Sequence, residues 1–408
     1  MSSIKSNKIN FEIVYFVALG AFSLGMSSYI TAGLIPFIQN EFNISIALTA
    51  QLVTAFTLAY GIGSPLVVAL LPENKQKFGL ISALFVFAIA NFISGIAPDF
   101  KTLFISRVFS GIGAGVYLAI GISVSTAVVS IENRGKAISL IMSGMAAGTV
   151  LGIPIGLLIS KAYGWQISMF IIAILGLISL VGLVIKLPQI SLEKQSLIEK
   201  LKILKDKKVL GILSISLIAA ISSLGLYTYL APFMAYPDFG SISNITPFLW
   251  VWGIGGIIGS YIVGYFSNKV KNTKLTAIIM LILALSLISI PFLAHINSWL
   301  VLIPIAIWGA VGWALQVPQN DQLINARENK GGGNLAVALN ESALYLGGAI
   351  GSGLGGLIYY FNLSPWLLPI LAGLVALIGL FIQLTLKKHN GVQSYIHCWP
   401  KKGTRIKG

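Results

Sequence analysis

Three ionisable side chains lie within, or at the end of, long apolar segments. Glu341 comes about eight residues into one such segment, roughly 12 Å along a helix with a rise of 1.5 Å per residue. Arg107 comes about two helical turns into another, and Asp321 stands at the end of a third. A charge at the centre of a membrane helix costs at least about 2.5–3.5 kcal/mol on insertion scales. These residues are therefore candidates for carrying a proton or balancing a charge.

Desolvation disfavours a charged carboxylate, which makes Glu341 a candidate proton carrier. Each of the three residues also has a structural interpretation. Glu341 could instead face a hydrated cavity mouth or pair with a polar neighbour. Arg107 could extend its charged end to the membrane surface, and Asp321 could simply face the cytoplasm.

Polar and aromatic side chains within the apolar segments are candidates for lining a binding cavity. Gln316 and Asn320 are four residues apart, which places them on one helix face. Any single aromatic residue is more often a packing residue or part of the interfacial belt. No charged cluster suited to phosphates or dicarboxylates occurs, so the sequence favours a neutral or cationic amphiphile. The cavity candidates are Tyr29, Thr54, Tyr60, Tyr117, Tyr227, Tyr229, Trp308, Gln316 and Asn320.

Several chemical motifs are missing from the sequence. It has no Walker A motif and no H-E-x-x-H motif, and its one cysteine, Cys398, cannot form a thiolate cluster. The histidines lie in a predicted outer loop, at His295, and in the C-terminal tail. We therefore expect no metal site, no cofactor and no enzymatic activity.

The composition indicates a helical membrane protein. Of the 408 residues, 56% are hydrophobic and 10% are charged, whereas soluble domains have about 25% charged residues. The mean hydropathy is +0.89. Continuous apolar runs long enough to cross a bilayer exclude an outer-membrane barrel. The predicted spans are residues 13–38, 47–71, 77–97, 101–129, 136–160, 167–187, 209–235, 244–268, 274–294, 299–324, 333–360 and 365–386.

A glycine seam marks the fifth predicted span. Its glycines recur every fourth residue and share one helix face, which permits a close helix neighbour. Pro154 removes a backbone hydrogen bond there and permits bending. We expect this helix to pack across the interface of two bundles and seal a cavity. The seam comprises Gly144, Gly148, Gly152 and Gly156, and it recurs about 199 residues later as Gly347, Gly351 and Gly355.

This recurrence predicts two similar halves, which is the pattern of many secondary transporters. The expected organisation is two pseudo-symmetric six-helix bundles with a polar connection and a basic tail. The expected segments are residues 1–187, 188–208, 209–386 and 387–408.

The distribution of basic residues predicts the orientation. The chain has 27 Lys and Arg residues, and its net charge is +15. With the N-terminus inside, all but three fall in cytoplasmic segments; Lys101 and Lys161 are outside, and Arg107 is within a span. This asymmetry predicts a multi-pass protein of the inner membrane with both termini in the cytoplasm. Because these charges lie in connections and tails, they do not indicate nucleic-acid binding.

Several motifs resemble those of the major facilitator superfamily, and more narrowly its bacterial drug:proton antiporters, which include arabinose-efflux-like and purine-efflux-like permeases. The similarity covers nearly all of the chain up to about Leu386. The span-five seam resembles that group's antiporter motif, and the resemblance implies that Arg107 organises a central cavity. The matching segments are Ala32–Pro36, Gly61–Pro65, Ser106–Gly111 and Gly148–Gly156.

The sequence also departs from the family pattern. The connection between spans two and three, a candidate gating loop, has Glu73 where an Asp is usual, and Lys75 and Lys77 where arginines are usual. The carboxylate that relatives often carry near the end of span one is absent, since that stretch reads Ser27–Thr31. The residue that carries the proton must therefore lie elsewhere.

These observations together predict a secondary transporter. We expect proton-coupled efflux of a small organic solute, such as a drug, sugar or nucleoside, by alternating access. The energy source would be the proton gradient, and the expected partners are the solute and the lipid bilayer, with the protein a monomer. Uptake by symport or facilitated diffusion is the alternative, and a polytopic enzyme or non-transporting sensor is a remote one.

Overall fold

The structure is a computed structural model that describes residues 11–72, 75–188, 203, 205–267, 269–327 and 333–396. These residues form helices and no strands, which confirms the predicted all-α membrane fold. Eleven segments of this part are long and apolar enough to cross a bilayer. A twelfth, α15, is 28 residues long but richer in glycine and polar residues.

The first six spans are formed by ten helical elements. Spans two and five are each built from two α-helices joined by a π-helical turn. The elements are α1 (Phe11–Phe42), α2 (Ile46–Leu58), η1 (Ala59–Gly63), α3 (Ser64–Leu70), α4 (Gln76–Gly95), α5 (Phe100–Val128), α6 (Arg134–Ala147), η4 (Gly148–Gly152), α7 (Ile153–Tyr163) and α8 (Gln166–Lys186).

The last six spans follow after the central connection, most of which lies outside the described residues. The tenth span combines α13 and α14. The elements are α10 (Lys207–Met234), α11 (Thr246–Ser267), α12 (Asn272–Ile296), α13 (Leu302–Ala314), α14 (Gln316–Arg327), α15 (Gly333–Tyr360) and α16 (Leu367–Ile396).

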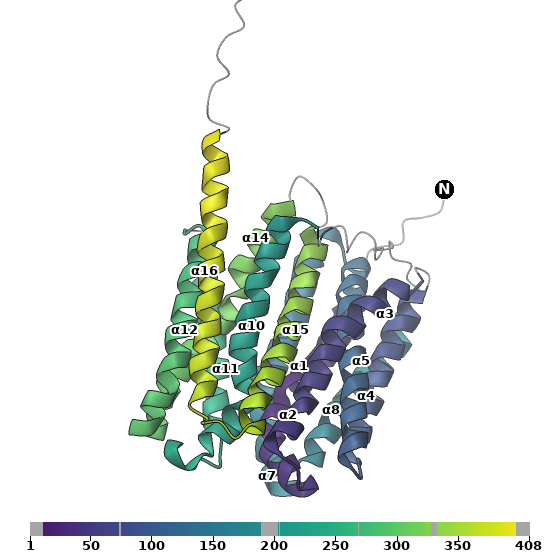
Figure 1. Ribbon diagram of the computed structural model, residues 1–408. Coiled ribbons are helices and arrows are strands. Elements are labelled where there is room, and N and C mark those ends of the chain that lie inside the picture. The colour runs from purple at the N-terminus through teal and green to yellow at the C-terminus, as the bar shows by residue number, and fades with distance from the viewer. Residues whose placement is uncertain are drawn as a thin grey trace, which may run out of the picture.

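The ends of the described chain lie on the same side of the molecule. In Figure 1, α1 begins at the upper end, and the last turns of α16 project beyond the other helices at that same end. The last helix continues to Ile396, ten residues past the predicted end of the span at 386. Residues 397–408 of the predicted tail lie outside the described residues.

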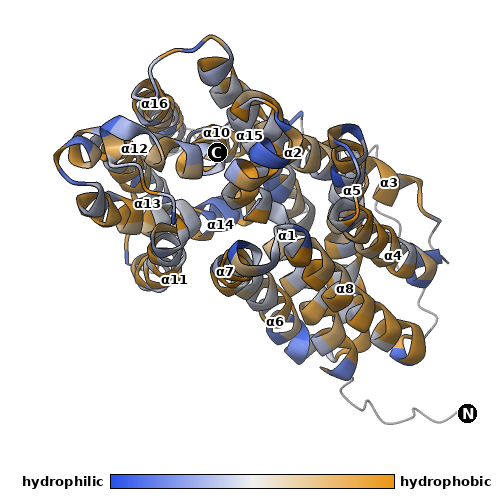
Figure 2. Ribbon diagram, turned by 90° about the horizontal axis from the view of Figure 1, so that it is seen from below, coloured by the Kyte–Doolittle hydropathy of each residue, from blue (hydrophilic) through white to orange (hydrophobic). Residues whose placement is uncertain are grey.

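The helices form two bundles whose outer surface suits lipid. Figure 2 shows the two groups of helices side by side from the end opposite the start of α1, with apolar residues dominating the peripheral helices. Many large apolar side chains are exposed on this surface, among them Leu70, Phe78, Ile303 and Phe381. The bundles meet where α2 contacts α15 and where α7 and η4 contact α11.

The glycine seam packs span five against span one. A Cβ atom on Gly144 would lie 2.5 Å from the Ala18 carbonyl oxygen, and one on Gly148 would lie 1.9 Å from that of Phe22. The seam therefore faces α1 of its own half, and it does not face the other half as expected. Span five reaches the second half elsewhere, because Val150 packs against Gly253 of α11.

The repeated glycines have the same role in the second half. A Cβ atom on Gly347 or Gly351 would lie 2.4 Å from the carbonyl oxygen of Leu217 or Ile221, respectively, both on α10. Span eleven thus packs on span seven as span five packs on span one. The predicted duplication is visible as this shared helix contact.

The bend expected at Pro154 takes the form of a π-helical turn. The turn η4 covers Gly148–Gly152 and ends just before this proline. Pro65 follows the π-turn η1, at Ala59–Gly63, in the same way. A proline cannot donate the usual backbone hydrogen bond, so the preceding carbonyls accommodate a wider turn.

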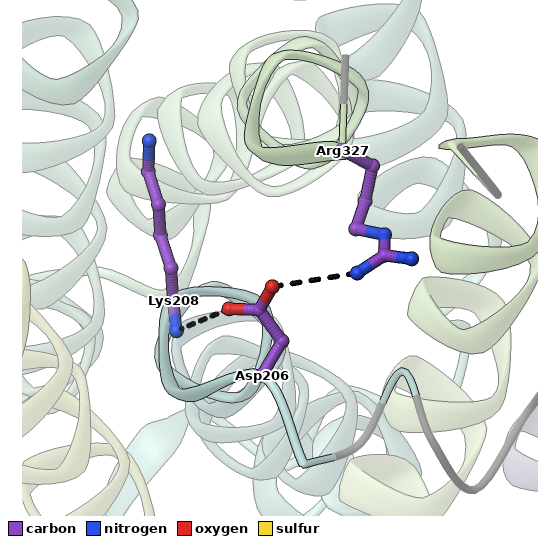
Figure 3. Close-up of polar contacts among 3 residues, drawn as sticks. All are labelled: Asp206, Lys208 and Arg327. Carbon is purple, nitrogen blue, oxygen red and sulfur yellow. Dashed lines mark hydrogen bonds and ion pairs between the residues drawn. The ribbon is translucent and has the colours of Figure 1, made fainter. Parts of the chain in front are cut away.

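An ion pair ties together two helix ends of the second half. One oxygen of Asp206 accepts a hydrogen bond from the Lys208 backbone N–H at 3.1 Å, which caps α10. The other oxygen lies 3.4 Å from a guanidinium nitrogen of Arg327 at the end of α14 (Figure 3). Both side chains are mostly buried, so this contact fixes the start of span seven against the end of span ten.

Candidate functional site

A cavity of about 410 Å³ lies between the two bundles. The first half contributes Tyr29 of α1, Met145 of α6 and Thr149 of η4. The second half contributes residues of α10 to α15, including Trp252 and Glu341. Most of the wall is apolar or aromatic, as is usual for sites that bind small organic molecules.

Glu341 is the one residue of this lining with a formal charge. It lies on α15, and within the described part of the chain it has no ion pair. Gln316 and Asn320 of α14 line the cavity as well. The predicted polar stripe and the predicted intramembrane carboxylate thus meet in one cavity.

Asn320 is held in place by a neighbouring helix. Its Oδ1 accepts a hydrogen bond from Nδ2 of Asn340 on α15 at 2.9 Å. This bond occupies the side-chain oxygen of Asn320 and leaves its side-chain NH₂ group as a hydrogen-bond donor. Asn340 is fully buried directly before Glu341, so this bond also ties α14 to the turn that carries the carboxylate.

Four aromatic rings give the cavity flat walls. They are Tyr29, Trp252, Trp313 and Tyr345. Trp252 is 3% exposed, and its indole nitrogen has no hydrogen-bond partner among the described residues. An indole N–H is a donor only, so Trp252 carries a buried donor without a partner among the described residues beside the cavity.

Sequence reasoning missed Trp252, Trp313 and Tyr345. One signal was present for Tyr345, because it stands four residues after Glu341 and therefore shares its helix face. No comparable signal marks the tryptophans, since α11 and α13 carry no charged residue and few polar ones.

Three other aromatic candidates support the wall from behind. The ring of Tyr60 stacks on Tyr345 with 3.5 Å between centroids. Tyr227 packs edge-on against Tyr29, with 5.6 Å between centroids. Trp308 is fully buried and donates a hydrogen bond from Nε1 to Ser223 Oγ, at 2.6 Å. Ser223 itself lines the cavity.

The remaining polar candidates lie outside the lining. Thr54 contacts Ser352 across the two halves, with 2.7 Å between the hydroxyl oxygens. Tyr117 is buried in the first half and donates to the Val17 carbonyl at 3.1 Å. Tyr229 donates to the Ser352 carbonyl inside the second half. These three residues contribute to packing within or between the halves.

Arg107 is fully buried in the first half, away from the cavity lining. Its guanidinium donates to the Ser27 carbonyl at 2.8 Å and to Asn91 Oδ1 at 3.3 Å. It also lies over the Phe56 ring, 4.5 Å from the centroid. The arginine therefore does not reach the membrane surface, and it holds α1 against α4 and α5.

Asp321 lies on α14 of the second half, at the same end of the molecule as the start of α1. Its carboxylate accepts hydrogen bonds from the side-chain amides of Asn272 and Asn325, the latter at 2.9 Å. It is not part of the cavity lining. Its position joins α14 to the start of α12.

The candidate gating loop is described only in part. Glu73 lies outside the described residues. The backbone N–H of Lys75 bonds to the Pro72 carbonyl at 3.0 Å, and the Lys77 side chain donates to the Leu187 carbonyl at the end of α8. The loop is thus tied to span six of its own half.

The comparisons with known proteins agree with this arrangement. The family model described as "Major Facilitator Superfamily" matches residues 17–332. The chain belongs to the major facilitator superfamily. The family consists of transporters, so this protein is a membrane transporter and not an enzyme.

Among curated superfamily members, "Inner membrane transport protein YdhP" of Escherichia coli K12 is 28% identical over 376 residues, which cover 92% of this chain and 95% of that protein. "Uncharacterized MFS-type transporter YbcL" of Bacillus subtilis is 27% identical, with coverage of 86% and 89%. "Putative transporter AraJ" of Escherichia coli K12 is 22% identical, also with coverage of 86% and 89%.

Solved structures of the superfamily share the fold. A mutant of the nucleoside transporter NupG has a TM-score of 0.70 at 14% identity, and the match covers 92% of this chain and all of that one (100%). The xylose transporter XylE from E. coli, in a partially occluded inward open conformation, has a TM-score of 0.69 at 16% identity, with coverage of 92% and 97%. At these identities the similarity concerns the fold alone.

Proposed function

We propose that this transporter exports a small organic solute in exchange for protons. The observation that carries the proposal is Glu341, a single carboxylate in an otherwise uncharged cavity between the two halves. A carboxylate in such a place binds a proton reversibly, and the change in its charge alters its electrostatic interactions with both halves. Two cargoes, a proton and a solute, would then use the cavity in turn.

The cavity wall supports a solute that is neutral or cationic and partly aromatic. Tyr29, Trp252 and Tyr345 offer ring faces, which attract other rings and cations. Gln316 and Asn320 offer hydrogen bonds. An anionic solute would meet Glu341 without a lining cation to offset the repulsion.

The proposed export direction is supported by the family resemblance of the glycine seam, and the charge asymmetry supports the orientation of the protein in the membrane. From the positive-inside rule we expect the start of α1, and that end of the bundle, to face the cytoplasm. The seam resembles the motif of exchangers that export their solutes. Uptake by symport is the second candidate, because the same cavity and carboxylate also suit co-transport.

A sensitivity screen tests this proposal. Cells that lack the protein and cells that overproduce it are exposed to a panel of toxic cations, nucleosides and sugars, each with and without a protonophore. Export predicts that deletion raises intracellular solute and sensitivity, that overproduction lowers both, and that the protonophore removes the protection. Lower intracellular solute in the deletion strain would favour uptake instead.

A further inference from the structure

Tyr345 contacts the opposite half both through its ring and through its hydroxyl group. No other aromatic residue of the cavity wall does so within the described part of the chain. Its ring stacks on Tyr60 of η1 at 3.5 Å between centroids and 16° between planes. Its hydroxyl lies 3.1 Å from Ser28 Oγ of α1. Another side of the same residue lines the cavity.

The direction of the hydroxyl bond follows from its surroundings. Ser28 Oγ donates its own hydrogen to the Leu24 carbonyl at 2.9 Å. Tyr345 must therefore donate to Ser28. Both residues are buried, with 3% and 1% of their surfaces exposed, so removal of either partner leaves the other without a replacement from bulk water.

The rings around Tyr345 come alternately from the two halves. Tyr60 belongs to the first half, Tyr345 to the second, Tyr29 to the first and Tyr227 to the second. Tyr29 and Tyr345 are nearly parallel, at 14° with 6.4 Å between centroids. Tyr29 and Tyr227 meet edge-on at 5.6 Å. Movement of one half away from the other must separate these interleaved rings.

We propose that Tyr345 is a positioning residue of the transport cycle, which holds the two halves together beside the cavity. Tyr345 must release Ser28 and Tyr60 before the cavity can open toward the end of the bundle opposite the start of α1. This inference rests on the proposed function. Because Tyr345 lies one helical turn from Glu341 on the same wall, a solute in the cavity touches the residue that joins the halves. Tyr345 thereby links the cavity to the contact between the two halves.

The test measures how often the closed contact opens. Ser352 is fully buried beyond Tyr345 on α15, and replacement of Cys398 by serine removes the one native cysteine. In this background, Ser352→Cys is labelled with a water-soluble maleimide in detergent micelles, where the reagent reaches both ends of the protein. When the open state is the minor one, the labelling rate follows its population.

Tyr345→Phe keeps the ring and loses the hydroxyl donor. We expect labelling of the introduced cysteine to rise about 2- to 12-fold, the range for one hydrogen bond of ordinary net strength. Ser28→Ala should give a similar increase, and the double variant should exceed neither single variant by much, because both remove the same bond. Tyr345→Ala should raise labelling further, since the stacking is lost as well.

Tyr117→Phe is the matched control. It also deletes a buried tyrosine hydroxyl that bonds to α1, but inside the first half. Its labelling rate should equal that of the parent. Unchanged labelling in Tyr345→Phe, additive effects with Ser28→Ala, or an equal rise in Tyr117→Phe would each overturn the role of Tyr345. The assay needs neither solute nor proton gradient, so failure of the export proposal would appear only in flux measurements.

Discussion

The hydroxyl oxygens of Thr54 and Ser352 lie 2.7 Å apart, although one belongs to α2 and the other to α15. Ser352 donates its own hydrogen to the Ala349 carbonyl at 3.1 Å, so Thr54 is the donor of the contact between the halves. The pair lies closer than Tyr345 to the end of the bundle opposite the start of α1. The halves are therefore joined on that side of the cavity.

A disulfide at this pair should stop transport. In the Cys398→Ser background, the double variant Thr54→Cys, Ser352→Cys should form a disulfide under mild oxidation, since the native oxygens are already within hydrogen-bond distance. Alternating access then predicts loss of flux on oxidation and recovery with a reductant. Each single cysteine variant should be insensitive to oxidation. Full flux in the cross-linked protein would exclude separation of the halves at this contact.

The glycine seam should be intolerant of even one methyl group. Gly148→Ala would bring a Cβ atom to 1.9 Å from a backbone oxygen of α1, so the helices must separate, at a cost of about 1–3 kcal/mol for overpacking. Thermal unfolding in detergent should show a lower midpoint. Gly353→Ala, where a Cβ atom would meet nothing within 4 Å, is the control and should unfold near the parent temperature. An unfolding midpoint for Gly148→Ala equal to that of the parent would contradict the packing role of the seam.

Arg107→Lys should destabilise the first half. An ammonium group cannot reproduce the two-pronged contact with Ser27 and Asn91, and a buried acceptor left unpaired costs about 1–3 kcal/mol. The same thermal assay should show a loss, whereas Arg134→Lys, at an exposed position, should change little. A parent-like midpoint for Arg107→Lys would mean that this hydrogen-bond network contributes nothing to stability.

Trp252→Phe tests the buried indole donor. For a solute found in the sensitivity screen, loss of one hydrogen bond should raise KM about 2- to 12-fold, while the maximal rate should change much less. Tyr261→Phe, an exposed aromatic on the same helix, should leave both values unchanged. A fall in the maximal rate alone would indicate that Trp252 acts in the conformational step and not in binding.

Much of the fold could be predicted because its determinants are local. Apolar runs of bilayer length marked the spans, and glycines at every fourth position marked two helices with close neighbours. The identity of those neighbours could not be predicted. A seam such as Gly144–Gly156 requires a nearby backbone, but nothing in its spacing says whether that backbone is α1 or a helix of the other half.

The site was predictable where burial of a polar group is costly and unpredictable where it is not. Glu341, Gln316 and Asn320 were identified because each is unusual in its apolar segment, and all three line the cavity. Tyr117 was chosen on the same reasoning but bonds to a backbone carbonyl of α1. Trp252 went unnoticed, because a helix with no charged and few polar residues gives little sign of how it is rotated about its axis.

The most direct measurement of the central claim uses proteoliposomes loaded with a solute from the sensitivity screen and an imposed pH gradient. Proton-coupled export through Glu341 predicts that the gradient drives the solute in the parent protein and in Asp321→Asn. In Glu341→Gln, exchange of solute at equal pH should persist while the gradient no longer drives net transport. A normal response of Glu341→Gln to the gradient would contradict the claim that this carboxylate carries the proton.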